Sequence, residues 1–258
     1  MKNYHAPAGS VLRLDNGSES TSVDLYSKDG FEMLSNLWIK VGAERRVMYD
    51  VTWLGRPIIQ FPTDMVLIQE LLWKVRPDVV IETGVAHGGS LVFAASILEL
   101  IGQGRVIGVD IEIRPHNREA ITTHPLAHRI SLVEGSSTAP ETFAQVQQRI
   151  NKGERVVVFL DSNHSEEHVK RELELYASLV SEGSYLVVHD GAQAWVGEIP
   201  GGRPEWLHNH PLGAIQSFLA FNKGFSVDPQ YTRYGITSSP CGFLKKENGG
   251  ESTSSDRT

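Results

Sequence analysis

The chain has very little cysteine: Cys241 is the only one among 258 residues. A single thiol cannot form an internal disulfide, and it cannot build a cysteine-based zinc cluster. Long apolar runs are also missing, since none approaches the roughly 20 residues that cross a bilayer. The first twenty residues lack the apolar core of a signal peptide. We therefore expect a cytoplasmic protein with no membrane segment.

An excess of positive charge is absent as well. The chain has 24 Lys and Arg against 31 Asp and Glu, which gives a formal net charge of −7. Nucleic acids and anionic membranes attract the opposite sign, so we expect neither as the main partner. Apolar residues make up 40% of the sequence, enough for a substantial core in a chain of this length.

Apolar runs typical of buried strands alternate with segments of helical periodicity. The strands are expected at 79–81, 106–109, 130–133, 156–160, 185–188, 225–232 and 242–246. The helices are expected at 31–41, 64–75, 91–100, 138–151, 166–181 and 212–221, with a capping box formed by Thr138 and Glu141. Continuous apolar strands indicate a sheet that is covered on both faces. The pattern predicts a doubly wound α/β fold with a seven-stranded, mostly parallel sheet.

The composition divides the chain into three parts. Residues 1–48 are expected to form an irregular N-terminal arm followed by a short helix, and residues 49–247 the main domain. Residues 248–258 are polar and of low complexity, which predicts a disordered tail. Residues 49–61 and 191–211 are expected to be loops that close over a substrate.

Two polar groups follow neighbouring strands at the points where these strands end. Asp161 and His164 come after the strand 156–160, and His189 and Asp190 come after the strand 185–188. Adjacent parallel strands deliver their carboxyl ends to one crevice, where ligands bind. Carboxylate oxygens suit Mg²⁺, and an imidazole can accept a proton near neutral pH. The sequence therefore predicts a metal site with a general base beside it.

Three further strand ends predict an adenosine-type cofactor. A turn rich in glycine follows the first strand, and its spacing is not the Gly-x-Gly-x-x-Gly of nicotinamide enzymes. An acid at Asp110 ends the second strand, where it can accept the hydroxyls of a ribose. Gly135 and Ser136 follow the third strand and would flank the adenine ring.

These segments together resemble class I S-adenosylmethionine-dependent methyltransferases. The motifs are Glu82-x-Gly84-x-x-x-Gly88-Gly-Ser90, Asp110, Gly135-Ser136 and Phe-Leu-Asp161-x-x-His164. The segment 53–60 and the helix at 64–75 are similar in particular to the cephalosporin hydroxylase/rhamnosyl O-methyltransferase family, over about residues 50–245. The resemblance implies a Mg²⁺-dependent O-methyltransferase acting on a sugar hydroxyl of a natural product, such as an antibiotic, or of a glycan.

The resemblance also implies which residues carry the function. S-adenosylmethionine would be bound by Glu82, Gly84, Gly88, Ser90, Asp110, Gly135, Ser136 and Asp161. Related enzymes hold the metal with an acid after the fourth strand and an acidic pair after the fifth, which places Asp161, His189 and Asp190 at the metal. The chain departs from that pattern with a histidine at 189. Asp161 and His164 would be the catalytic residues.

Other interpretations of the same residues stay open. Asp161 could cap the helix that begins near Ser165, His164 could be a surface residue, and His189 could donate a hydrogen bond from its ring. The chain could instead be a β-lactam-tailoring enzyme or a non-catalytic, cofactor-binding partner of another enzyme. The N-terminal arm makes exchange of segments between subunits reasonable, so we expect a homo-oligomer with a sugar acceptor as its small-molecule partner.

Overall fold

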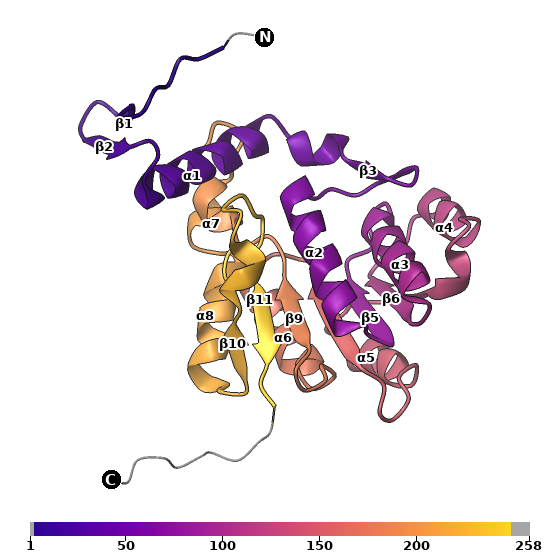
Figure 1. The fold of residues 1–258 in the computed structure, drawn as a ribbon. Coiled ribbons are helices and arrows are strands. Elements are labelled where there is room, and N and C mark those ends of the chain that lie inside the picture. The colour runs from indigo at the N-terminus through magenta and orange to yellow at the C-terminus, as the bar shows by residue number, and fades with distance from the viewer. Residues whose placement is uncertain (1–2, 249–258) are drawn as a thin grey trace, which may run out of the picture.

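A computed structural model describes residues 3–248, which form a three-layer α/β fold (Figure 1). The central sheet has seven strands in the order β10-β11-β9-β8-β5-β6-β7. The strands are β5 (Val79–Thr83), β6 (Arg105–Asp110), β7 (Ile130–Glu134), β8 (Val156–Leu160), β9 (Tyr185–Val188), β10 (Phe225–Val227) and β11 (Phe243–Lys246). Strands β5 to β9 pair in parallel, and β11 runs antiparallel to both of its neighbours. The predicted sheet is confirmed.

Helices cover both faces of this sheet, which explains the continuous apolar strands. The helices after the N-terminal region are α2 (Pro62–Val75), α3 (Gly89–Ile101), α4 (Pro115–Thr122), α5 (Pro140–Gln147), α6 (Glu166–Tyr176), α7 (Gln193–Val196) and α8 (Pro211–Phe221). Leu67 of α2 and Leu91 of α3 are fully buried in the core of one face. Leu173 of α6 and Ile215 of α8 are buried in the core of the other face. Every residue of β5, β8 and β9 is therefore shielded from water.

The strand order creates the switch point at which such sheets bind ligands. From β5 the chain continues to β6 on one side, and it later returns to β8 on the other side. The loops that follow β5 and β8 consequently diverge around one crevice at the carboxyl edge of the sheet.

The N-terminal region differs from the expected irregular arm. Strands β1 (Val11–Asp15) and β2 (Ser20–Asp24) form an antiparallel hairpin, which extends away from the sheet in Figure 1. Helix α1 (Lys28–Glu44) is longer than the predicted 31–41, and the Ser27 side chain caps it by accepting a hydrogen bond from the Gly30 N–H. The hairpin strands are almost wholly exposed, so they lack the alternation of apolar and polar residues that identifies a half-buried strand.

Several other boundaries were predicted wrongly. The expected loop at 49–61 contains a second small hairpin, and the expected loop at 191–211 contains α7 and a 3₁₀ helix. The hairpin consists of β3 (Thr52–Trp53) and β4 (Arg56–Pro57), and the 3₁₀ helix is η3 (Pro204–Leu207). A further 3₁₀ helix, η1 (Val47–Asp50), overlaps the start of the first expected loop. The predicted strand 225–232 ends at Val227, and η4 (Pro229–Thr232) follows it; α4 and η2 (Ala127–Arg129) were not predicted. All of these elements are short, and short elements give little periodic signal.

The expected capping box at Thr138 is absent. Ala139 is the N-cap of α5, and no side chain caps this helix. The Thr138 hydroxyl lies instead 3.1 Å from that of Ser136. Helix α5 ends at Gln147 rather than 151, and α6 at Tyr176 rather than 181. The predicted tail lies outside the described residues from 249 onward, and no helix within 3–248 is long and apolar enough to span a membrane.

Candidate active site

The glycine turn after β5 packs against the backbone of neighbouring loops. Gly84 has φ +93°, and a Cβ atom there would lie 1.9 Å from the Asp161 carbonyl oxygen. Gly88 also has positive φ (+78°), and it immediately precedes α3. Glycine is therefore required at 84 both for its backbone conformation and because the loop after β8 passes directly over it.

Glu82 lies in β5, just before this turn, and it is buried with 1% exposure. Burial raises the pKa of this carboxyl group to about 8, although a hydrogen bond from the Ser90 side chain opposes the change. Its Oε2 atom has no hydrogen-bond partner among the described residues. A buried acceptor without a partner is costly, so this oxygen fits a cationic ligand group, such as the amino group of a methionine moiety.

Asp110 joins the end of β6 to the glycine turn. Its Oδ2 atom accepts hydrogen bonds from the backbone N–H groups of Val85 at 2.7 Å and Ala86 at 3.3 Å. Its Oδ1 atom accepts one from the Glu112 N–H at 3.1 Å. A carboxylate has about four lone-pair positions, so Asp110 retains capacity for a hydroxyl donor such as a ribose.

Gly135 and Ser136 follow β7 at the same edge of the sheet. A Cβ atom on Gly135 would lie 2.3 Å from the Thr142 hydroxyl oxygen, which shows how closely α5 approaches this loop. The loop therefore passes close to α5 at the side of the crevice where β6 and β7 end.

The structure brings Asp161, His164 and Asp190 together. Each offers one ligand atom, and these three atoms all lie within 4.8 Å of one another. The His164 Nε2 atom is 3.2 Å from the Asp190 Oδ2 atom. Two of the residues follow β8 and the third follows β9, so the pairing of these parallel strands creates the group. Two carboxylates and one imidazole in this arrangement could hold a divalent cation.

The electrostatics of the site are dominated by acids. The pKa of Asp161 is raised well above its usual value, first by burial and then by neighbouring negative charges. These charges come from Asp190, Glu82, Glu172 and Asp64. Several carboxyl groups in one poorly solvated region repel one another unless positive charge is supplied. A divalent cation and a sulfonium would supply such charge.

His189 lies behind this group rather than in it. Its side chain is 2% exposed, and burial lowers its pKa to about 4, so the ring is neutral at neutral pH. Its Nδ1 atom is 3.2 Å from the Ser239 hydroxyl, and its ring packs edge-on against Phe159. The histidine that joins Asp161 and Asp190 is His164. The geometry thus favours the interpretation of His189 as a hydrogen-bonding residue over that of a ligand.

The other open interpretations can be compared with the geometry directly. Ser165 is the N-cap of α6, and the Asn163 side chain accepts the hydrogen bond from its N–H at 2.9 Å. Asp161 takes no part in this cap. The His164 side chain is 26% exposed and paired with Asp190, which is unlike a free surface residue.

Two sets of residues at the site were missed from the sequence. Glu172 is fully buried in α6, and its Oε1 atom accepts a hydrogen bond from the Ser162 hydroxyl at 2.7 Å. The only available signal was its position three residues after Val169, on the inward face of the helix. Arg56 donates from Nε to the His87 carbonyl at 3.0 Å, and Asn117 donates to the Ala86 carbonyl at 2.8 Å. Nothing in the sequence links these distant positions.

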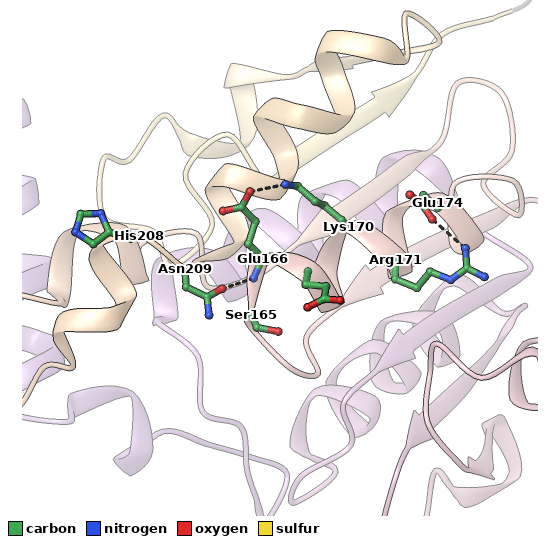
Figure 2. A pocket seen from close by; sticks show the side chains of 8 residues that line it. Ser165, Glu166, Lys170, Arg171, Glu174, His208 and Asn209 are labelled. Atoms are coloured by element: carbon green, nitrogen blue, oxygen red, sulfur yellow. Dashed lines mark hydrogen bonds and ion pairs between the residues drawn. The ribbon is translucent and has the colours of Figure 1, made fainter.

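A polar groove of about 640 Å³ lies along the outer side of α6, and its lining includes Ser165, the residue that follows His164 in the sequence. Figure 2 shows its lining side chains, which come from α6 and from the segment that follows η3. The Asn209 side chain accepts a hydrogen bond from the Glu166 N–H at 2.7 Å and so ties that segment to the start of the helix. The two lining cations are already paired, Lys170 with Glu166 and Arg171 with Glu174.

Comparisons with known proteins show which family the chain resembles. A family model described as "Rhamnosyl O-methyltransferase/CmcI" matches residues 45–247. A relative from Mycobacterium bovis named rhamnosyl O-methyltransferase is 34% identical over 200 residues, which cover 75% of this chain and 77% of the relative. The protein of the same name from Mycobacterium leprae is 30% identical over 208 residues, with 75% and 82% covered.

Solved structures show the same fold. A CmcI structure described with Mg and SAM superimposes with a TM-score of 0.55 at 20% identity and covers 78% of each chain. A CmcI apo-structure gives a TM-score of 0.53 at 22% identity, with 78% of this chain and 77% of the other covered. These similarities confirm the methyltransferase-type α/β fold.

Proposed function

The chain belongs to the rhamnosyl O-methyltransferase/CmcI family, and we propose from this premise that it transfers the methyl group of S-adenosylmethionine to a sugar hydroxyl. The observation that carries the proposal is the group of Asp161, His164 and Asp190 beside the buried Glu82. Such a site combines places for a cation, a base and a positively charged cofactor at one edge of the sheet.

The cofactor would lie across the carboxyl ends of β5, β6 and β7. The Oε2 atom of Glu82 would accept a hydrogen bond from the amino group of the methionine moiety, and Asp110 would accept those of the ribose hydroxyls. The adenine would lie near the loop after β7. The complete proposed set is Glu82, Gly84, Gly88, Ser90, Asp110, Gly135, Ser136 and Asp161.

Asp161 and Asp190 fit a divalent cation such as Mg²⁺, because they offer carboxylate oxygens in a region with an excess of negative charge. When bound, the cation would orient the acceptor's hydroxyl group and stabilise negative charge that develops on its oxygen. His189, which the family resemblance also places at the metal, would support this site without binding the cation, since its ring is directed to Ser239.

His164 would act as the general base. It would take the hydroxyl proton of the acceptor while the acceptor oxygen bonds to the methyl carbon and the bond from that carbon to sulfur breaks. Its pairing with Asp190 stabilises the positive charge that the imidazole then carries. The products are the methyl ether and S-adenosylhomocysteine.

The acceptor would extend from this centre into the groove on α6. The lining cations Lys170 and Arg171 are paired with glutamates, and Glu167 adds a further negative charge. A diphosphate would find no free positive charge there, whereas the groove suits neutral hydroxyl groups. This favours a glycoside over a nucleotide sugar. Residues 191–211 border the groove through His208 and Asn209 and would close over the bound acceptor.

The protein is further proposed to act as a cytoplasmic homo-oligomer. Its single cysteine fits a reducing compartment. Helix α1 exposes an apolar stripe, each residue of which is at least 40% exposed. The stripe consists of Phe31, Leu34, Trp38 and Val41. Burial of such a stripe against a second subunit would remove apolar surface from water.

The function can be tested with methyl-labelled S-adenosylmethionine and a panel of rhamnosides, other glycosides, nucleotide sugars and cephalosporins. We expect label in a glycoside hydroxyl, loss of transfer with EDTA, and recovery with Mg²⁺. Label in a cephalosporin would favour a β-lactam-tailoring enzyme. Cofactor binding without transfer, and with Asp161→Ala affecting only stability, would favour a non-catalytic partner protein.

A further inference from the structure

Asp64 is a buried acid that the proposed mechanism does not use. It lies in the first turn of α2, is 0% exposed, and its Oδ1 atom has no hydrogen-bond partner among the described residues. Burial raises its pKa to about 6, against the effect of hydrogen bonds from Thr237 and Ser238. Burying a carboxyl group in this way costs stability, which indicates that its place in the fold serves another purpose.

Asp64 holds the segment 236–240, which connects η4 to β11. The Oδ2 atom of Asp64 accepts hydrogen bonds from Ser238, at 2.8 Å from its N–H and at 3.0 Å from its hydroxyl. The neighbouring Thr63 hydroxyl donates to the Ile236 carbonyl at 2.6 Å. The first turn of α2 is therefore bonded to this segment at two points.

The same segment holds the end of β9. The Ser239 hydroxyl is 3.2 Å from the His189 Nδ1 atom, and both residues are buried. The Ala192 N–H donates to the Ser238 carbonyl at 3.0 Å. The hydroxyls of Ser238 and Ser239 are 3.4 Å apart. Hydrogen bonds thus run from Asp64 through two serines to His189.

Asp190 lies between these two anchored points. Its φ is +57°, in the left-handed region that residues other than glycine adopt only where their surroundings impose it. His189 precedes it and Ala192 follows two residues later, and both are bonded to residues 238 and 239. The backbone that aims the Asp190 carboxylate is therefore held by the segment that Asp64 anchors.

We propose that Asp64 is a positioning residue that acts through Ser238, Ser239 and His189 to hold Asp190 where its carboxylate faces Asp161 and His164. The inference rests on the proposed function, because it concerns the cation that Asp161 and Asp190 would bind. Residues that orient metal ligands from behind typically contribute about 10- to 100-fold to metal affinity.

The test is a titration with Mn²⁺, read by electron paramagnetic resonance, in the presence of S-adenosylhomocysteine. We expect Asp64→Asn and Ser239→Ala each to weaken Mn²⁺ binding by about tenfold or more. The affinity for S-adenosylhomocysteine should stay within about twofold of the unmodified protein, because Glu82 and Asp110 lie outside the network.

Ser184→Ala is the matched control. Ser184 is also fully buried, and it lies just before β9, where its hydroxyl donates to the Val156 carbonyl at 2.6 Å. Its loss should lower Tm by a similar amount and leave Mn²⁺ affinity unchanged. Should Asp64→Asn fail to fold, Ser239→Ala carries the test alone.

A fourth variant, Asp190→Asn, separates the inference from the function on which it rests. If Asp190→Asn weakens Mn²⁺ binding while Asp64→Asn and Ser239→Ala behave like Ser184→Ala, the positioning role is overturned and the proposed function stands. If Asp190→Asn leaves Mn²⁺ affinity unchanged, both the positioning role and the proposed cation site are overturned, and methyl transfer is judged by the labelling assay. The Mn²⁺ affinity of the double variant Asp64→Asn/Ser239→Ala should equal that of the single variant with the lower affinity. Such non-additive losses support action along one chain of hydrogen bonds.

Discussion

Glu154, at the amino edge of the central sheet, and Glu82 and Asp161, at its carboxyl edge, have pKa values shifted in opposite directions. At the amino edge, where β5, β6 and β8 begin, Arg105 forms an ion pair with Glu154 at 2.7 Å, and the Arg155 N–H donates to Asp78 at 2.8 Å. The Arg105 side chain lowers the pKa of Glu154 to about 2. At the carboxyl edge, burial raises the pKa of Glu82 to about 8, and it raises that of Asp161 as well.

The difference shows which acids have partners within the chain and which require a bound ligand. At the amino edge, Glu154 is paired with Arg105 and Asp78 accepts a hydrogen bond from the Arg155 N–H, so both acids have partners within the chain. At the carboxyl edge, no arginine or lysine is among the causes of the shifted pKa values of Glu82 and Asp161. Neither of these two acids has an ion-pair partner among the described residues. Their charge can be balanced only by protons or by bound cations. A divalent ion and a sulfonium cofactor meet that requirement, which is the physical reason for locating the chemistry there.

The largest effect is expected from Asp161→Asn. Loss of this carboxylate removes a proposed cation ligand and the negative charge next to the sulfonium, so kcat should fall by about 10³-fold or more. Steady-state assays at saturating Mg²⁺ would measure it. The charge-removing variant at the other edge, Glu154→Gln, should leave kcat unchanged. Equal losses of kcat in both variants would contradict the distinction between the two edges.

His164→Gln should lower kcat by about 10²- to 10³-fold, because glutamine can form a hydrogen bond but cannot accept the proton. S-adenosylmethionine affinity should be unchanged, since His164 pairs with Asp190 and is not among the residues proposed to bind the cofactor. Calorimetry and steady-state kinetics on the same preparation would separate the two quantities. A Kd that rises with no loss of kcat would remove His164 from the role of base.

Much of the carboxyl edge could be predicted from sequence, because parallel strands converge. The strands predicted at 156–160 and 185–188 have the same bounds in the structure. Once β8 and β9 are neighbours, Asp161 and Asp190 must lie close together. The glycine turn and Asp110 could be located for the same reason.

The parts that could not be predicted depend on contacts between distant segments. The choice of His164 over His189 as the companion of Asp190 is decided by Ser239, 50 residues further along the chain. Arg56 donates a hydrogen bond to His87 in the glycine turn, 31 residues further along the chain, and hydrophobic periodicity cannot predict a contact between such distant residues. The hairpin β1–β2 was not predicted for another reason. Its strands are almost wholly exposed, so they show no alternation of apolar and polar residues.

Glu82→Gln should weaken S-adenosylmethionine binding by about 10- to 100-fold at pH 8, where the unmodified carboxyl group is about half ionised. In the unmodified protein, affinity should rise with pH by at most about tenfold per unit up to pH 8, because the ionised form binds the cofactor's amino group. The variant should lose this dependence. Calorimetry from pH 6 to pH 8.5 would measure both effects, and an equal pH dependence in the two proteins would contradict the assignment.

The smallest effect is expected at the amino edge, from Glu154→Gln. The variant removes a partly buried ion pair with Arg105, so the free energy of unfolding should fall by about 1 kcal/mol at pH 7. The folded pKa of Glu154, about 2, lies below its usual value of 4.5, so this contribution is present above pH 4.5 and is lost as pH falls toward 2.

The raised pKa of Glu82 acts with the opposite sign: its contribution is present below pH 4.5 and is lost as pH rises through 8. Urea unfolding of Glu154→Gln and Glu82→Gln between pH 2 and pH 8 should therefore show differences from the unmodified protein that change in opposite directions with pH. Parallel changes would mean that the two edges do not differ in how their charges are balanced.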